Sequence, residues 1–249
     1  MGTLFEENKP DREQVMNSVS VLQWFNEHGI WIPGVYLSMP QCQALWKSKN
    51  NELHDGNSPN DYATKSTKIV NLMWSVVSKY VHSTDSILEL GSNCGVNLNG
   101  LNQFGYTNLH GIEINKNAIN EMNVSFPNLK AYFINASLEN GLPSLPRNTF
   151  DLVFSMAVLL HIHPSSNHIF KDIVRVSKKY ILTIEGEEYN CKYVFPRNYK
   201  RVFEQLECIQ IEQIIITKET HPELKQYWGY TLRLFEKNTK NKSEFASFV

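Results

Sequence analysis

The chain has 249 residues, of which 42% are hydrophobic and 12% aromatic, enough for one α/β domain with an additional segment. Its formal net charge of −1 gives no bulk attraction to nucleic acid or to an anionic membrane, so neither is expected as a partner. No apolar run approaches the ~20 residues of a membrane-spanning helix. The four cysteines are scattered without a C-x-x-C pair, which is typical of reduced thiols in a cytoplasmic protein.

The first 56 residues contain little that indicates a function. Hydrophobic periodicity predicts an amphipathic helix over 15–28. We expect residues 1–56 to form an extension that packs on the main domain as a cap, with a lid that grips a substrate as the alternative. The polar segment 50–60 is typical of a linker. A helix is predicted over 59–81, with a Ser-Pro pair at its start.

A glycine-containing loop after the first predicted strand is the most informative feature. The apolar run 87–90 is typical of a buried parallel strand, Gly91 ends it, and Gly95 begins a helix. Such a loop places backbone N–H groups and the positive end of a helix together at the end of the strand, which suits a nucleoside-bearing cofactor. The spacing is not the G-x-G-x-x-G of dinucleotide-binding proteins, because Asn93 and Val96 occupy the second and third glycine positions. A nicotinamide oxidoreductase is therefore disfavoured.

The second predicted strand ends in an acidic residue. Strands are predicted over 109–114 and 131–135, with a helix over 116–126 between them. Glu113 lies 18 residues after Gly95, close to the ~20-residue offset at which a carboxylate accepts hydrogen bonds from ribose hydroxyls. A solvated strand end is the alternative.

The second half of the chain predicts the rest of a sheet. Strands are expected over 150–155 and 180–185, helices over 169–177 and 197–206, and a closing antiparallel pair over 208–217 and 230–236. We therefore expect an α/β fold with a doubly wound seven-stranded sheet. The expected divisions are an extension over 1–56, a domain over 57–237 and a polar tail over 238–249.

Two segments resemble class I S-adenosylmethionine (SAM)-dependent methyltransferases. Glu-Leu-Gly-Ser-Asn-Cys-Gly, beginning at Glu89, is similar to their first motif, E/D-x-G-x-G-x-G, with Asn93 in place of the middle glycine. The segment 150–164 is similar to their "FDxVxxxxVLxHI" segment. The likeness covers roughly residues 60–236, and implies a Rossmann-like sheet, SAM as cofactor and methyl transfer to an acceptor.

A narrower likeness is to methyltransferases of bacterial surface-sugar biosynthesis, including pseudaminic-acid-associated methylases. It implies a small polar acceptor, such as a hydroxyl of a sugar or sugar-like metabolite. The Asn/Asp-Pro-Pro-Tyr segment of amino-methylating nucleic-acid enzymes is absent after the fourth predicted strand, which argues against DNA base methylation.

The resemblance also implies which residues bind the cofactor. Ile114 would lie against the adenine ring, while Asn135 or Ser137 would bond to that ring or cap the next turn. The predicted cofactor-binding residues are Glu89, Gly91, Asn93, Gly95, Glu113, Ile114, Ser137 and Ser155.

Methyl transfer to a hydroxyl needs a base, and two histidines follow the fourth predicted strand. His161 and His163 would be neutral at cytoplasmic pH, since histidine has an unperturbed pKa of ~6.5. Glu185, at the end of the fifth predicted strand, is the rival base. Either histidine could instead cap a short helix or satisfy a buried carbonyl. No nearby Cys or Asp completes a metal set with His-x-His, so no metal is expected.

The fifth predicted strand is followed by a polar loop. There we expect Arg197 to bind an anionic part of the acceptor, with Tyr199 beside it, because a guanidinium matches a carboxylate or phosphate. Pairing of Arg197 with a local Glu at a helix start is the alternative. Two other functions stay open: a non-catalytic SAM-fold binding or assembly module, and methylation of a protein.

Overall fold

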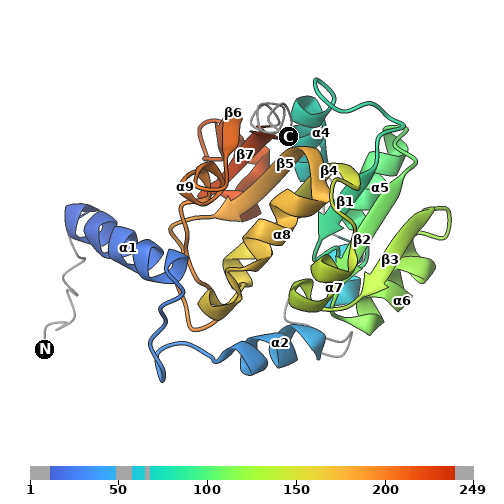
Figure 1. Cartoon of the computed structure of the whole chain (residues 1–249). Coiled ribbons are helices and arrows are strands. Elements are labelled where there is room, and N and C mark those ends of the chain that lie inside the picture. Colours follow the sequence, from blue (N-terminus) through green and yellow to red (C-terminus); the bar gives the residue numbers. More distant parts are fainter. Residues whose placement is uncertain (1–11, 49–57, 65–67, 239–249) are drawn as a thin grey trace, which may run out of the picture.

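The computed structural model describes residues 12–48, 58–64 and 68–238 (Figure 1). Seven strands form one sheet in the order β3-β2-β1-β4-β5-β7-β6. The strands are β1 (Ile87–Leu90), β2 (Leu109–Glu113), β3 (Ala131–Asn135), β4 (Phe150–Met156), β5 (Ser177–Gly186), β6 (Cys208–Ile215) and β7 (Tyr230–Lys237). β1 to β5 pair in parallel, and β7 lies antiparallel between β5 and β6. This confirms the predicted doubly wound sheet.

Helices cover both faces of the sheet (Figure 1). The α-helices are α1 (Arg12–Glu27), α2 (Met39–Lys47), α3 (Pro59–Ala63), α4 (Lys68–Val77), α5 (Val96–Gln103), α6 (Lys116–Ser125), α7 (Leu138–Ser144), α8 (Ile169–Val176) and α9 (Tyr199–Glu204). Short 3₁₀ helices are η1 (Leu159–His161), η2 (Pro164–Ser166) and η3 (Pro222–Tyr227). Within the described ranges, no helix has the length and apolar character needed to span a bilayer.

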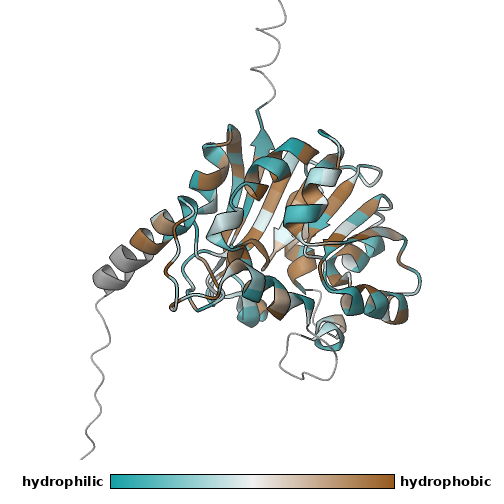
Figure 2. Cartoon of the chain, turned by 60° about the horizontal axis from the view of Figure 1, so that its bottom comes forward, coloured by the Kyte–Doolittle hydropathy of each residue, from teal (hydrophilic) through white to brown (hydrophobic). Residues whose placement is uncertain are grey.

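Two hydrophobic clusters hold these helices to opposite faces of the sheet. Successive side chains of a strand point to opposite faces, so Ile87 packs with α4 and α5 while Leu88 and Leu90 pack with α7 and α8. Hydrophobic residues follow the strands through the middle of the molecule (Figure 2). Burying a side chain of this size contributes about 1.5–3 kcal/mol. The apolar surface is thus used within the layers, which leaves the strand ends for polar groups.

The first helix binds the main domain through buried polar contacts. Gln23 Nε2 donates to the carbonyl of Glu187 at 2.9 Å, and Asn26 Nδ2 donates to that of Pro196 at 2.9 Å. The carbonyl of Asn26 accepts from Asn167 Nδ2 at 2.6 Å. The N-terminal extension is therefore fixed to the segments that follow β4 and β5, beside the carboxyl ends of those strands.

The order of strands reverses between β1 and β4. From β1 the chain proceeds outward to β2 and β3, and from β4 it proceeds outward to β5 on the other side. In open α/β sheets the ligand binds at such a switch point, beyond the carboxyl ends of the strands.

Candidate functional site

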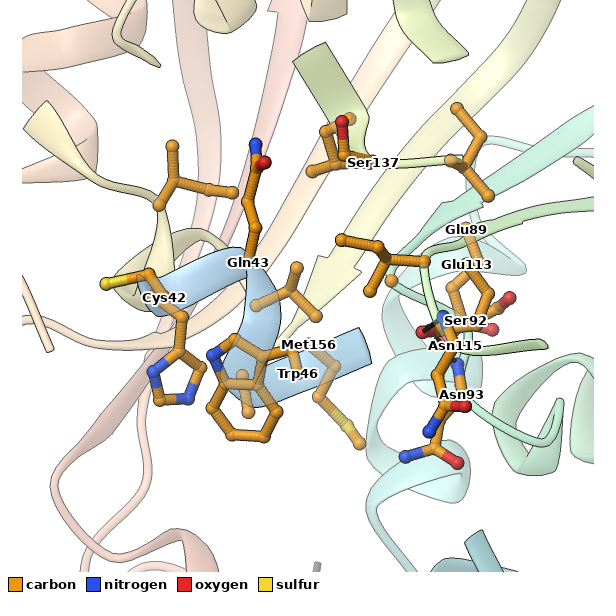
Figure 3. A pocket seen from close by; sticks show the side chains of 18 of the residues that line it. Cys42, Gln43, Trp46, Glu89, Ser92, Asn93, Glu113, Asn115, Ser137 and Met156 are labelled. Carbon is orange, nitrogen blue, oxygen red and sulfur yellow. Dashed lines mark hydrogen bonds between the residues drawn. The ribbon is translucent and has the colours of Figure 1, made fainter. Parts of the chain in front are cut away.

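A pocket of about 150 Å³ lies at this switch point (Figure 3). One side, the β1–β3 wall, comes from the ends of β1, β2 and β3 and the segments after them: Glu89, Gly91, Ser92, Asn93, Val96, Asn97, Ile112, Glu113, Ile114, Asn115, Ala136, Ser137, Leu138 and Glu139. The other side, the α2–β4 wall, comes from α2 and the end of β4: Met39, Cys42, Gln43, Trp46, Met156, Ala157, Val158, His161, Ile162 and His163. Tyr62, Ile69 and Tyr227 also line the pocket.

The loop after β1 curls through three residues with positive φ. Gly91, Asn93 and Gly95 have φ values of 65°, 48° and 76°. Asparagine enters the left-handed region more readily than other residues with a side chain, so Asn93 adopts the conformation for which glycine is usually needed. A Cβ on Gly91 would lie 2.7 Å from the side chain of Val158, so this position has no room for one. The loop conformation therefore survives the departure from the three-glycine motif.

Glu113 joins the end of β2 to this loop. Its carboxylate accepts the backbone N–H of Asn93 at 2.7 Å and that of Asn115 at 2.8 Å. Only 7% of the residue is exposed, and burial raises its pKa while the backbone N–H groups oppose the rise. Each carboxylate oxygen can still accept a second hydrogen bond from a ligand in the pocket.

The pocket contains an unusual number of unpaired buried polar atoms. Buried polar groups in proteins nearly always have partners, and one left without a partner costs about 1–3 kcal/mol. Six pocket residues each have a buried side-chain atom without a hydrogen bond: Trp46 Nε1, Glu89 Oε2, Ser92 Oγ, Asn97 Oδ1, Ser137 Oγ and His163 Nε2. Their concentration at one place indicates that a polar ligand completes the site.

His161 presents a free lone pair. Its Nδ1 lies 3.0 Å from the carbonyl oxygen of Tyr193. A carbonyl oxygen only accepts, so Nδ1 carries the proton and Nε2 has the lone pair of the neutral ring. The His161 ring packs 4.4 Å from that of Trp46, and burial lowers the pKa of His161 to about 4. The imidazole is therefore neutral at physiological pH.

His163 has the opposite tautomer. Its Nδ1 accepts the backbone N–H of Ser165 at 3.2 Å, so the proton of the neutral ring is on Nε2, which is buried without a partner. Burial and the nearby Arg197 guanidinium lower the pKa of His163. The two histidines thus offer the pocket one hydrogen-bond acceptor and one donor.

The central part of the chain is similar to a known protein family. Residues 88–180 match a family model described as a methyltransferase domain. This span is similar to that family. It includes the loop after β1, Glu113 and both histidines of the pocket. No curated protein sequence matches the chain significantly.

Solved structures extend the likeness beyond the matched span 88–180. Magnesium protoporphyrin IX methyltransferase from Synechocystis PCC 6803 with bound S-adenosylhomocysteine (SAH) gives a TM-score of 0.56 at 9% identity, covering 89% of this chain and 100% of that chain. A SAM-dependent methyltransferase from Methanosarcina mazei gives 0.53 at 18%, covering 65% and 96%. A structure described as the complex between the Haloferax volcanii Trm112 methyltransferase activator and "the putative methyltransferase" gives 0.54 at 13%, covering 72% and 96%.

At these identities the solved structures show a shared fold. The matched domain and that fold together support a SAM-dependent methyltransferase of class I, with SAM as its cofactor. The acceptor of the methyl group does not follow from these likenesses.

The predicted site residues fall into two groups, those that line the pocket and those that do not. The pocket brings together Glu89, Gly91, Asn93, Glu113, Ile114, Ser137, His161 and His163. Ser137 is the N-cap residue of α7, but its side chain makes no capping hydrogen bond. Asn135 instead donates to the carbonyls of Glu113 and Ile114. Ser155, Glu185, Arg197 and Tyr199 do not line the pocket, and Gly95 caps α5 facing apolar side chains behind the loop.

Glu185 has a supporting position. It is fully buried, and its carboxylate accepts Ser155 Oγ at 2.9 Å. It also accepts three successive backbone N–H groups of the segment after β4, those of Val158, Leu159 and Leu160. Burial raises its pKa to about 7 against these donors. Glu185 therefore fixes the segment that carries the histidines, and the prediction that it or Ser155 faces the site needs correction.

Arg197 binds the same segment from its other end. Its Nη2 donates to the carbonyl of Ile162 at 2.7 Å and to Asn167 Oδ1 at 2.9 Å, and its Nη1 donates to the carbonyls of Leu159 and Phe195. The residue is fully buried, so the structure does not place the guanidinium where it could bind an acceptor. Tyr199 is not placed to bind an acceptor either, because it is buried in the hydrophobic cluster formed by residues of α8 and α9 and their neighbours.

Sequence reasoning missed the contribution of α2. Met39, Cys42, Gln43 and Trp46 stand at i, i+3, i+4 and i+7, the spacing of one helix face, and all four line the pocket. The signal was present in Ser38, whose capping box with Gln41 begins the helix.

Proposed function

We propose that this methyltransferase transfers the methyl group of SAM to a hydroxyl of a small polar acceptor, such as a sugar-like metabolite. The observation that carries the proposal is the free Nε2 lone pair of His161, in the wall opposite the loop after β1. A hydroxyl needs a proton acceptor when it attacks, whereas a non-catalytic binding module needs none.

The β1–β3 wall suits the cofactor. The carboxylate of Glu113 is available to accept hydrogen bonds from the ribose hydroxyls, and Ile114 and Ser137 lie beyond it on the same wall. All three carboxylates of the pocket lining, those of Glu89, Glu113 and Glu139, belong to this wall. Burial raises the pKa of Glu89 well above its usual range, and a cationic group beside it favours the ionised form. The wall therefore complements a ligand with a sulfonium and an ammonium group. We therefore assign this wall to SAM.

The α2–β4 wall then receives the acceptor. His161 Nε2 takes the proton of the hydroxyl while its oxygen attacks the methyl carbon in line with the carbon–sulfur bond, which breaks and leaves SAH. His163 Nε2–H donates a hydrogen bond to an oxygen of the acceptor and so orients it. Glu185 and Arg197 hold the backbone of residues 158–162, which leads into and joins the two histidines.

The first experiment tests the cofactor. Calorimetry should show binding of SAH and no binding of NADH. If the protein binds NADH and not SAH, the proposed function is wrong.

The second experiment tests the transfer. Methyl-labelled SAM is incubated with the protein and a cell extract that is then separated into small molecules and macromolecules. Label should enter an alkali-stable ether among the small molecules. His161→Ala should lower the rate by about 10²-fold or more with unchanged SAH affinity, because it removes a general base.

The matched control is His82→Ala, which alters an exposed histidine outside the pocket and should transfer label as the wild type does. Label that enters protein would favour a protein acceptor. SAH binding without transfer to any fraction would favour a binding module.

A further inference from the structure

We propose that the acceptor is uncharged, with a flat apolar face that lies against Trp46 and a neutral polar edge that pairs with Gln43. This inference rests on the proposed function, because it takes the α2–β4 wall as the acceptor side of the pocket. It replaces the anionic acceptor that the sequence led us to expect.

The first observation in favour of an uncharged acceptor is the lack of charged side chains on the α2–β4 wall. Every residue of the α2–β4 wall is apolar or neutral, since both histidines are held in their uncharged form. Among the described residues that line the pocket, none is a lysine or an arginine. A carboxylate or phosphate placed here would lose its water without gaining a cation, which is strongly unfavourable.

Arg197 does not supply the missing cation. It lies near His163, but its two terminal nitrogens already donate to three carbonyls and the Asn167 side chain, and the residue is fully buried. A cationic acceptor is disfavoured as well, because it would approach the positive sulfonium of the cofactor. An uncharged molecule remains as the class that the wall accommodates.

Trp46 provides a flat surface on this wall. Its ring lies 4.4 Å from that of His161 and 6.3 Å from that of Tyr193, and its Nε1 is buried without a hydrogen-bond partner. Figure 3 shows the indole beside Met156. An indole face of this kind packs against the C–H face of a sugar ring or against an aromatic ring. The indole N–H can donate a hydrogen bond to an oxygen of the bound molecule.

Gln43 offers a neutral polar contact. Its side chain extends from α2 into the space that Ser137 faces from the other side (Figure 3). The amide has no hydrogen bond to any residue that the structure describes. An amide both donates and accepts, so it matches an uncharged hydroxyl or carboxamide and lacks the charge to neutralise an ion.

The wall is held in place before a ligand binds. Tyr36 and Cys42 pack against Phe195, and the backbone N–H of Leu37 donates to the carbonyl of Lys192 at 2.7 Å. The extension that carries α2 lies outside the matched span 88–180. Trp46 and Gln43, on which the proposed preference depends, therefore belong to the N-terminal segment and not to the matched span.

The test compares probes of similar size and shape that carry different charges. SAH-saturated protein is titrated with 4-hydroxybenzamide against 4-hydroxybenzoate and 4-hydroxybenzylamine, and with phenyl β-D-glucoside against phenyl β-D-glucuronide, by ligand-observed NMR. In at least one set the neutral probe should bind ten-fold or more tightly than its charged partners. Trp46→Ala should weaken that binding at least ten-fold, and Gln43→Lys should shift the preference toward the carboxylate.

The matched control is Trp74→Ala, because Trp74 is 37% exposed on α4 and stacks on Phe104 outside the pocket. It should leave all affinities unchanged, and Trp46→Phe replaces Trp46→Ala if that variant does not fold. The inference is overturned if a charged probe binds as tightly as its neutral partner, or if no probe shows binding that depends on Trp46. If the wild-type protein does not bind SAH at all, the proposed function itself is contradicted.

Discussion

Removal of the Glu113 carboxylate tests the cofactor site most directly. The group accepts the backbone N–H groups of Asn93 and Asn115 and lines the pocket on the side assigned to SAM. Glu113→Ala therefore changes two things at once. It removes the acceptor for the ribose hydroxyls, and it leaves two backbone N–H groups of the site without a partner.

The two effects have separate magnitudes. A hydrogen bond to a charged group contributes about 1.5–3 kcal/mol, so loss of the ribose contact should weaken SAH binding roughly ten- to a hundred-fold. The two backbone hydrogen bonds lost in the ligand-free protein are of the same kind, so the free energy of unfolding should fall by roughly 3 kcal/mol or more. A carboxylate at an exposed strand end would give neither effect, but Glu113 is only 7% exposed.

Glu113→Gln separates the two contributions. The amide of Gln keeps one oxygen that can accept a hydrogen bond, but its NH₂ group faces the second backbone N–H and cannot accept from it. We therefore expect losses of SAH affinity and stability that are smaller than those of Glu113→Ala. Glu204→Ala is the matched control, because Glu204 lies on α9 outside the pocket and its side chain is 45% exposed beside Lys200. A surface ion pair of this type contributes about 0–1 kcal/mol.

The assay is SAH calorimetry combined with thermal unfolding of each variant with and without SAH. Both affinity and melting temperature should fall for Glu113→Ala and stay near wild type for Glu204→Ala. Wild-type SAH affinity in a folded Glu113→Ala protein would refute the assignment of this carboxylate to the cofactor.

Two further predictions concern the base and the loop. With a pKa of about 4, His161 is protonated only in strongly acidic solution, and because the neutral form is the base, kcat/KM should fall below about pH 5. An acidic limb near pH 6.5 that disappears in His161→Gln would contradict this low pKa. Asn93→Gly should keep the SAH affinity of the wild type, since glycine adopts a φ of 48° freely. Asn93→Val should weaken SAH binding by roughly ten-fold. The left-handed region costs a residue with a side chain about 1–2 kcal/mol, and Val lacks the local hydrogen bond of Asn. Equal affinities of the two variants in calorimetry would show that the loop conformation does not matter.

The strands could be predicted from the sequence because each is a short apolar run. The range predicted for the third strand, 131–135, is that of β3, and the predicted antiparallel pair became β6 and β7. The helix α7 was missed because its sequence contains Gly141 and Pro143, which disfavour helix. Burial of Leu138 and Leu142 in the core outweighs that propensity.

The cofactor side of the pocket was predictable for a related reason. The carboxyl ends of parallel strands meet at one edge, so residues at the ends of β1, β2 and β3 come together whatever the loops do. The direction of an individual polar side chain beyond β5 has no such rule. Glu185 and Arg197 were expected to face the ligand because they lie at or after the end of the fifth strand, where adjacent strand ends converge on one crevice. Burying such a charge inside the protein is costly. Four donors around one and four acceptors around the other offset that cost inside the protein.

The separate roles of His161 and His163 could not be predicted from the sequence either, because the sequence does not tell which backbone group each side chain meets. His161 and His163 are chemically identical, and only one residue separates them. The first meets a backbone carbonyl through Nδ1, and the second meets a backbone N–H through the same atom. These two contacts leave a lone pair on one Nε2 and a proton on the other. One imidazole can therefore take a proton from the acceptor while its neighbour donates a hydrogen bond to it, and the backbone that Glu185 and Arg197 fix decides which does which.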